Sequence, residues 1–547
     1  MKKKVIGLLA SAGIMFSYFG IAQANANSVH ADALTYDKYG SGTMADPWVI
    51  KSDGQWEDLA YAVAAGTENF SGKYFKLDAD INAGSNMIGT TSKQFDGSFD
   101  GNNHKVTLAN NSFNGDDFAA FGKIGGSAVV KNLNVYGSIK TGTSNQGTDV
   151  AGVAVENLGT IDNCDSYVEF DGKLGGVGGI VSNNSGTIKD CEIQCKFNVS
   201  SKDNIGGVVG TNATNGIVRN CKNNSPFQTD MIIASGQVAG GIVGLNNGKV
   251  YDCYTDQIIK FTSWTSVGGI VGSNGTTGYI YNCINDGGIE GTGSKVGGIV
   301  GNNVGYLYNS VGKKTVKITN GSIAGNIFGY NKGSLVNVAN YSTFSNTNST
   351  SAGSFGGEND GGSFVNCFDT VGSSSGIIGN NHEQQIPVQK VSYAQANKGH
   401  GAIYTGDDNV NNGKALLDIF NEYVDDSANA SITNGFDHWK KGVDSEPVPQ
   451  ANLYKITITP NTATLGEKEE TLTVSATGVD DQKVTVKMNV VETPVFETYN
   501  KVTDVNDLAE DDIIVLASGT TAYAVAPGTN AYMGAVKFEN TKNASLT

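Results

Sequence analysis

One glycine-rich motif recurs along the middle of the chain, and this repetition constrains the fold more than any other feature. Residues 240–253 and 268–283 carry nearly the same sequence. The second glycine of each copy is found at Gly152, Gly179, Gly207, Gly241, Gly269, Gly298, Gly325 and Gly353, which gives steps of 27, 28, 34, 28, 29, 27 and 28 residues. A unit this short cannot bury a core alone, so it must stack on its neighbours. The repeat therefore predicts a solenoid.

The composition of each copy indicates strands and not helices. Short β-branched runs such as Ile242 and Val243 are bounded by Gly and Asn, which favour turns. We expect three short strands and three turns per copy, so that each copy forms one coil of an all-β, right-handed parallel β-helix. The coils should stack about 4.8 Å apart. The 34-residue step, which contains Pro226, Phe227 and Gln228, should hold an insertion that bulges from a turn.

Six cysteines occupy one position of the repeat, directly after an Asn or Asp, and should form a ladder along the rod. They are Cys164, Cys191, Cys221, Cys253, Cys283 and Cys367, with Ser310 and Val338 at the equivalent point of two other copies. Metal sites usually use closely spaced pairs such as C-x-x-C, which are absent here, and parallel ladder neighbours are poorly placed for disulfides. We predict reduced, buried thiols. The preceding Asn/Asp column should satisfy turn backbone (Asn163, Asp190, Asn220, Asp252, Asn282, Asn309, Asn337 and Asn366).

The consensus Gly-Gly-Ile-Val-Gly-x-Asn-x-Gly-x-Ile-x-Asn-Cys resembles the GLUG repeat of bacterial surface proteins, which also occurs N-terminal to immunoglobulin-A-cleaving metallopeptidases. Upstream segments at 40–50, 72–81 and 95–104 are similar to the opening of these β-helical regions, so the resemblance covers residues 38–385. It implies an exported, adhesin-like surface protein of a bacterium without a defined ligand. The repeats are scaffold and imply little about function.

The N-terminus is typical of export. Residues 1–26 combine a basic start, an apolar stretch and small residues at Ala22, Ala24 and Ala26, which predicts a cleaved signal peptide and a secreted or cell-surface location. We expect no membrane insertion after cleavage, because no other long apolar run exists. The net charge is −16 and Arg219 is the single arginine, which argues against binding nucleic acid.

Changes of pattern predict the domain organisation. Residues 36–90 should form an N-terminal cap and first strands, with a short helix near 56–60, and residues 91–385 the β-helix. Residues 386–450 should be a C-terminal cap and linker that closes the coil stack, with a helix at 414–424. Period-two alternation predicts a small immunoglobulin-like β module at 451–493 and a second, incomplete one at 494–547.

The search for chemistry yields no catalytic, cofactor or metal residues. The chain lacks H-E-x-x-H, G-x-S-x-G and P-loop motifs. Two functions stay open. The first is a non-catalytic scaffold that binds an extracellular glycan or protein, with Tyr279 and Tyr306 as the candidate ligand face; Tyr251, Tyr281 and Tyr308 share one repeat position and are interpreted as a packed column. The alternative is a polysaccharide lyase or hydrolase using carboxylates among Asp78, Asp80, Asp96 and Asp100.

Overall fold

The computed structural model describes most of the chain from residue 35 onward. The described residues are 35–113, 117–141, 147–201, 203–224, 231–233, 236–319, 323–346, 349–370, 376–381, 391–397, 401–404, 414–442 and 446–450, together with the strands at 466–476, 479–490, 521–525 and 532–537. The predicted signal peptide at 1–26 and the predicted bulge at Pro226–Gln228 lie outside these residues.

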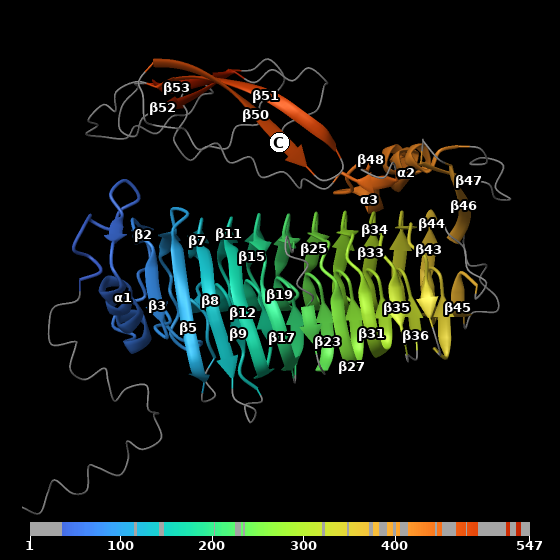
Figure 1. The fold of residues 1–547 in the computed structure, drawn as a ribbon, viewed down its shortest axis with the longest axis horizontal. Helices are drawn as coiled ribbons and strands as arrows, with labels where there is room; N and C mark the ends of the chain where they lie inside the picture. The colour runs from blue at the N-terminus through green and yellow to red at the C-terminus, as the bar shows by residue number, and fades with distance from the viewer. Residues whose placement is uncertain are drawn as a thin grey trace, which may run out of the picture.

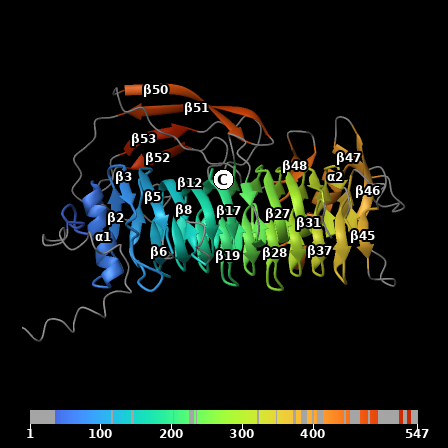
Figure 2. The ribbon, with the colours of Figure 1, turned by 60° about the horizontal axis from the view of Figure 1, so that its bottom comes forward.

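The described repeats form one parallel β-solenoid (Figure 1), which confirms the predicted fold class. Face A has 12 strands, from β1 (Trp48–Ile50) to β43 (Ser363–Val365), and face C has 10, from β6 (Phe121–Ile124) to β45 (Ile378–Asn381). Figure 2 turns face C toward the viewer. Strands pair with the strand one coil away, as Val243 pairs with Val271 and Val271 with Val300.

The third sheet of the solenoid, face B, differs from the expectation of one short strand per coil and face. In many coils it consists of two or three segments, such as β16 (Glu192–Ile193), β17 (Lys196–Ser201) and β18 (Asn204–Gly206). The register of the 34-residue step shifts in two places: by two residues in the turn before β20 (Ile217–Arg219), and by a further four between β21 (Lys222–Asn223) and β22 (Met231–Ile233), where residues 225–230 lie outside the described residues. Bends between segments let a long face follow the coil without interrupting the parallel pairing of its neighbours.

A ladder of buried asparagines runs along the inside of the rod where face C turns toward face A. Its members are at most 2% exposed: Asn157, Asn184, Asn212, Asn246, Asn274, Asn303, Asn331 and Asn359. From Asn157 to Asn331, each side-chain amide donates to the Oδ1 of the asparagine in the following coil at 2.8–2.9 Å. The Oδ1 of Asn246 also accepts from the Gly248 N–H at 3.1 Å. Each asparagine thus closes its own turn and joins two coils, because buried amide groups need partners on both sides.

The Asn/Asp residues at the repeat position before the ladder cysteines turn the chain through their own backbone conformation, whereas the structure shows their side chains bonded mainly to one another and not, as predicted, to turn backbone. All eight have positive φ, between 42° at Asn309 and 59° at Asn337. Asn and Asp are the non-glycine residues that enter this left-handed region most readily. Their side chains also connect coils, as when the amide of Asn337 donates to Asn309 Oδ1 at 2.6 Å. The column therefore turns the chain between faces A and B.

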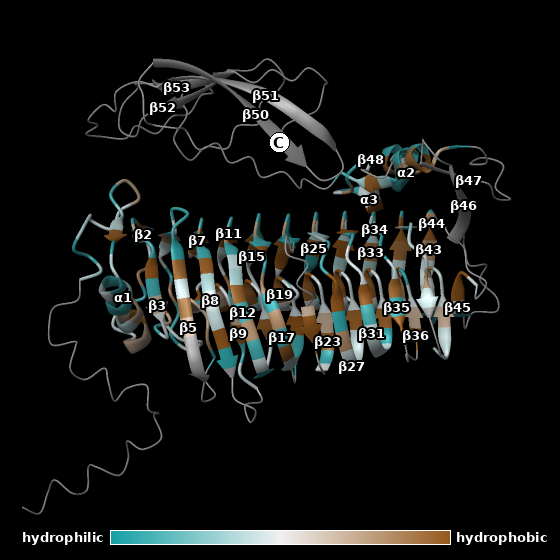
Figure 3. Ribbon diagram, in the orientation of Figure 1, coloured by the Kyte–Doolittle hydropathy of each residue, from teal (hydrophilic) through white to brown (hydrophobic). Residues whose placement is uncertain are grey.

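Apolar residues fill the rod and helix α1 (Asp53–Ala65) covers its N-terminal end. Strands alternate between polar and apolar residues along their length (Figure 3). The side chain of Ser52 caps α1 by accepting from the Gln55 N–H, and the helix ends at Gly66, which has φ 71°. Trp56 and Leu59 point from α1 into the core and are fully buried. No helix within the described residues is long and apolar enough to cross a membrane.

Helix α2 (Leu416–Asp425) forms at the predicted helical segment but in an unexpected place. The sequence predicts that it closes the end of the coil stack, whereas the structure lays it against the side of the last coils (Figure 1). Further along, the hairpins β50–β51 (Gly466–Ala476, Val479–Val490) and β52–β53 (Thr521–Val525, Tyr532–Lys537) are antiparallel. The rest of the two predicted β modules lies outside the described residues.

We predict that the substitution Asn246→Ala destabilises the rod. It leaves the amide of Asn212, the Oδ1 of Asn274 and the N–H of Gly248 without their buried partner. Each unsatisfied buried group costs about 1–3 kcal/mol. The Asn212 amide keeps its bond to the Gly216 carbonyl at 3.1 Å, so the losses at Asn274 and Gly248 should lower the free energy of unfolding by about 2–6 kcal/mol. Urea unfolding followed by circular dichroism measures this. Asn215→Ala, at an exposed turn position, is the matched control and should change little; equal effects of both substitutions would contradict the ladder's role.

Candidate functional site

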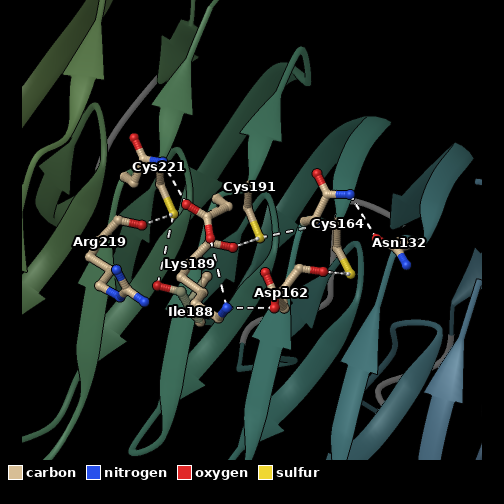
Figure 4. Close-up of polar contacts among 11 residues, drawn as sticks. Asn132, Asp162, Cys164, Ile188, Lys189, Cys191, Arg219 and Cys221 are labelled. Carbon is tan, nitrogen blue, oxygen red and sulfur yellow. Dashed lines mark hydrogen bonds and ion pairs between the residues drawn. The ribbon is translucent and has the colours of Figure 1, made fainter. Parts of the chain in front are cut away.

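The six ladder cysteines lie inside the rod: those from Cys164 to Cys283 stack on successive coils, and Cys367 follows beyond Ser310 and Val338. Figure 4 shows Cys164, Cys191 and Cys221. Each thiol donates to the carbonyl oxygen two residues earlier, at 3.1 Å for Cys191 and 3.4 Å for Cys164. Burial raises the pKa of the Cys164, Cys191 and Cys221 thiols well above the usual value. A neutral, hydrogen-bonded thiol packs as a small apolar group and is a poor nucleophile.

The seventh cysteine, Cys195, is absent from the ladder and is also buried. Its thiol lies 3.2 Å from Ser166 Oγ on the neighbouring coil, and burial raises its pKa to about 11. All seven cysteines are free. Among the residues that the structure describes, no group of three or more His, Cys, Asp or Glu side chains is arranged to hold a metal ion.

Five tyrosines cluster on the outer surface of face A, and we call this group the tyrosine face: Tyr251, Tyr279, Tyr281, Tyr306 and Tyr308. They come from β25 (Lys249–Tyr251), β29 (Tyr279–Tyr281) and β33 (Tyr306–Tyr308), which are neighbours in the sheet. The rings of Tyr279 and Tyr306 stack with centroids 4.4 Å apart and planes 15° apart. The structure thus brings together the two residues that the sequence singled out as a ligand face.

The other three tyrosines form part of the same surface. Tyr251 and Tyr281 stack at 4.6 Å with nearly parallel planes, whereas Tyr308 tilts by 57° against Tyr306. All five side chains are half-buried. Burial raises the pKa of Tyr308 to about 12 and also raises those of Tyr251, Tyr279 and Tyr281. The phenols of these four tyrosines therefore remain protonated at neutral pH, so they can exchange hydrogen bonds with a ligand but are poor general bases.

A segment far along the chain borders the tyrosine face, and we call it the strap: residues 414–442 and 446–450. It contains α2, the short helix α3 (Ala430–Thr433) and the hairpin of β48 (Trp439–Lys441) and β49 (Pro447–Pro449). Phe436 of the strap packs against Tyr308, with ring centroids 5.5 Å apart. The tyrosine face is thus bounded on one side by a second part of the chain.

Sequence reasoning missed the strap's docking surface, although the repeat carries a signal for it. The outward position after each ladder cysteine is polar in the early coils (Asp165, Glu192 and Lys222) and apolar in the later ones (Tyr254, Ile284, Val311, Ala339 and Phe368). The later residues form one buried cluster with Leu416, Ile419 and Phe420 of α2 and with Trp439. An outward column that changes from charged to apolar predicts a covering segment.

The carboxylates considered for catalysis are engaged in turns and ion pairs: Asp78, Asp80, Asp96 and Asp100. Asp100 accepts from the Asn102 N–H at 2.8 Å and lies 3.4 Å from Lys131. The Lys105 N–H donates to Asp80 at 2.9 Å, and this bond lowers the pKa of Asp80. A carboxylate held ionised is a poor general acid, so these contacts favour a structural role.

Comparison with known proteins adds one similar structure. No protein-family model and no curated protein matches the chain. A solved structure from Bacteroides ovatus, described as a "putative immunoglobulin A1 protease", is 19% identical, and the similarity covers 76% of this chain and 95% of that chain with a TM-score of 0.28.

We predict that all seven cysteines are reduced and shielded in the native protein. Thiol reagents should modify them very slowly without denaturant, because burial removes access and suppresses the thiolate. In concentrated guanidinium without reductant, titration should find seven free thiols per chain. Recovery of fewer thiols, with disulfide-linked peptides in a non-reducing digest, would contradict this.

Proposed function

We propose that the chain is a secreted or cell-surface β-helix scaffold of the GLUG-repeat type, adhesin-like and non-catalytic, that binds an extracellular partner through the tyrosine face. The single observation that carries this proposal is the group of five half-buried tyrosines on adjacent strands of the rod. Tyrosine is enriched at the centres of protein interfaces because it combines a large apolar ring with a hydrogen-bonding tip. The export-type N-terminus supports an extracellular location.

The stacking geometry favours a protein ligand over a glycan. Sugars are usually bound on open ring faces, but Tyr279 and Tyr306 cover each other's faces, as do Tyr251 and Tyr281. A ligand that approaches the rod from the side would meet ring edges and hydroxyl groups. Such edges suit backbone and side-chain hydrogen bonds together with apolar contacts. We therefore place an extracellular protein first and a glycan second.

We predict that the double substitution Tyr279→Ala with Tyr306→Ala weakens ligand capture without unfolding the rod. The partner would first be identified by screening the mature protein against arrays of host matrix proteins and glycans. Loss of an interface hot spot costs at least about 2 kcal/mol, so affinity should fall at least about 30-fold. Surface plasmon resonance measures the affinity, and circular dichroism checks the fold.

Tyr136→Ala with Tyr167→Ala is the matched control. This pair stacks at 4.4 Å in the same way but lies on face B, so its loss should leave binding intact. Equal binding by both double variants would exclude the tyrosine face. Turnover of a polysaccharide by the native chain, abolished by Asp96→Asn or Asp100→Asn with the fold intact, would show that the enzymatic alternative is correct.

A further inference from the structure

The strap is held to the rod by hydrogen bonds to two members of the positive-φ asparagine column. The amide of Asn282 donates to the Gly435 carbonyl at 2.9 Å, and the Asp437 N–H donates back to Asn282 Oδ1 at 3.1 Å. The amide of Asn309 donates to the Asp437 carbonyl at 2.8 Å, and the indole N–H of Trp439 donates to Asn309 Oδ1. Residues 435–439 thus bind along the rod in one defined position.

Aromatic packing secures the same segment. Phe420 of α2 stacks on Trp439 with centroids 3.9 Å apart and meets the rod residue Phe368 edge-on at 5.3 Å. All three are buried, at 0–3% exposed. The strap therefore shields the apolar column of the later coils from water, which supplies its main driving force for docking.

One contact in this interface is incompatible with two ionised partners. Asp252 and Asp437 bind the same side chain: Asp252 Oδ1 accepts from the Asn282 amide at 2.8 Å, and the Asp437 N–H donates to Asn282 Oδ1 at 3.1 Å. Asp437 Oδ2 is buried and has no hydrogen-bond donor among the described residues. Two neighbouring carboxylates repel unless one of them carries a proton.

We infer that the strap is a proton-dependent clamp, held closed by a proton shared between the carboxyl groups of Asp252 and Asp437. Loss of that proton places two negative charges at the strap–rod junction and weakens docking. Opening exposes the apolar column from Tyr254 to Phe368 and removes Phe436 from the edge of the tyrosine face. This inference rests on the docking contacts and holds whatever the tyrosine face binds.

The surrounding charges set the pH range. Burial raises the pKa of Asp437 to about 7, with Asp252 as the second cause, and burial also raises the pKa of Asp252. Arg219 on β20 (Ile217–Arg219) opposes the shift at Asp252, and Lys440 opposes it at Asp437. Since docking raises both pKa values, docking takes up a proton. It is strongest in acid and is lost progressively as the pH rises from the ordinary carboxyl range through about 7.

A second titratable pair lies on the strap and must be distinguished. His438 Nε2 is 2.7 Å from Asp425 Oδ1 of α2, and both side chains are more than half exposed. This ion pair forms within the strap and does not face Asp252 or Asp437. Asp425→Asn is therefore a matched control, because it removes a strap carboxylate without touching the proposed proton.

Hydrogen exchange measured by mass spectrometry on the full chain tests the clamp. Protection of peptides from 414–442, corrected for intrinsic exchange, should fall at least about tenfold between about pH 5 and about pH 8, because docking takes up a proton and is therefore weakened as the pH rises. Rod peptides from 240–300 serve as the internal reference. In Asp437→Asn the amide can donate to Asp252 at every pH, so strap protection should become nearly independent of pH, and Asp252→Asn should behave alike.

The outcomes separate clearly. The clamp is supported if strap protection depends on pH in the native chain and in Asp425→Asn, but is independent of pH in Asp437→Asn and Asp252→Asn. Flat protection of the native strap would overturn the inference, as would amide variants that keep the native pH dependence. If the strap of one asparagine variant fails to dock at any pH, the other variant provides the test. Asp437→Asn places the replacing amide on the strap, and Asp252→Asn places it on the rod.

Discussion

Every column of side chains on this rod exists because each strand pairs in parallel and in register with the strand one coil away. Equivalent residues of successive copies therefore lie about 4.8 Å apart, so each side chain must pack against, or bond to, a side chain at the same repeat position in the next coil. Amides meet this condition, because each can donate to the next and accept from the previous one. Charges meet it by alternating in sign, as where Lys123 pairs with Glu156 and Lys317 with Glu290 across one coil.

The same spacing explains the glycines that make the repeat visible. A Cβ on Gly241 would lie 2.0 Å from the carbonyl oxygen of Gly269 on the next coil, and one on Gly207 would lie 2.0 Å from that of Gly241. A side chain at this position would have to displace the neighbouring coil. In the register of the strands, Gly297 pairs with Gly325 and Gly325 with Gly353, so Gly325 and Gly353 occupy the first glycine position, and Asn326 and Ser354 occupy the second. The close approach of two backbones thus explains the second glycine from Gly152 to Gly298, and the last two copies depart from it.

Local rules made most of the rod predictable. The period identified the parallel solenoid, and the shared repeat position identified the turn column from Asn163 to Asn366, whose positive φ the structure then showed. The adjacency of Tyr279 and Tyr306 followed from their equal places in successive copies. The predicted position of the strap at the end of the coil stack was wrong, because its actual position depends on contacts between residues more than a hundred positions apart, such as Asn309 with Asp437. The proton that we propose Asp252 and Asp437 to share depends on the same long-range contacts and has no local signature in the sequence.

The strap also shows what kind of partner this rod can hold. The strap, a segment of the same chain, binds the side of the rod through asparagine side chains of the positive-φ column and through an aromatic stack. The tyrosine face borders this contact and offers ring edges and phenol hydroxyls beside the same column. The rod thus already binds a polypeptide segment beside the tyrosine face. An external protein could be bound there by the same kinds of contact, namely hydrogen bonds and aromatic packing. A flat sugar would need open ring faces, and in-register stacking of tyrosines in adjacent coils covers one face of each ring in both pairs.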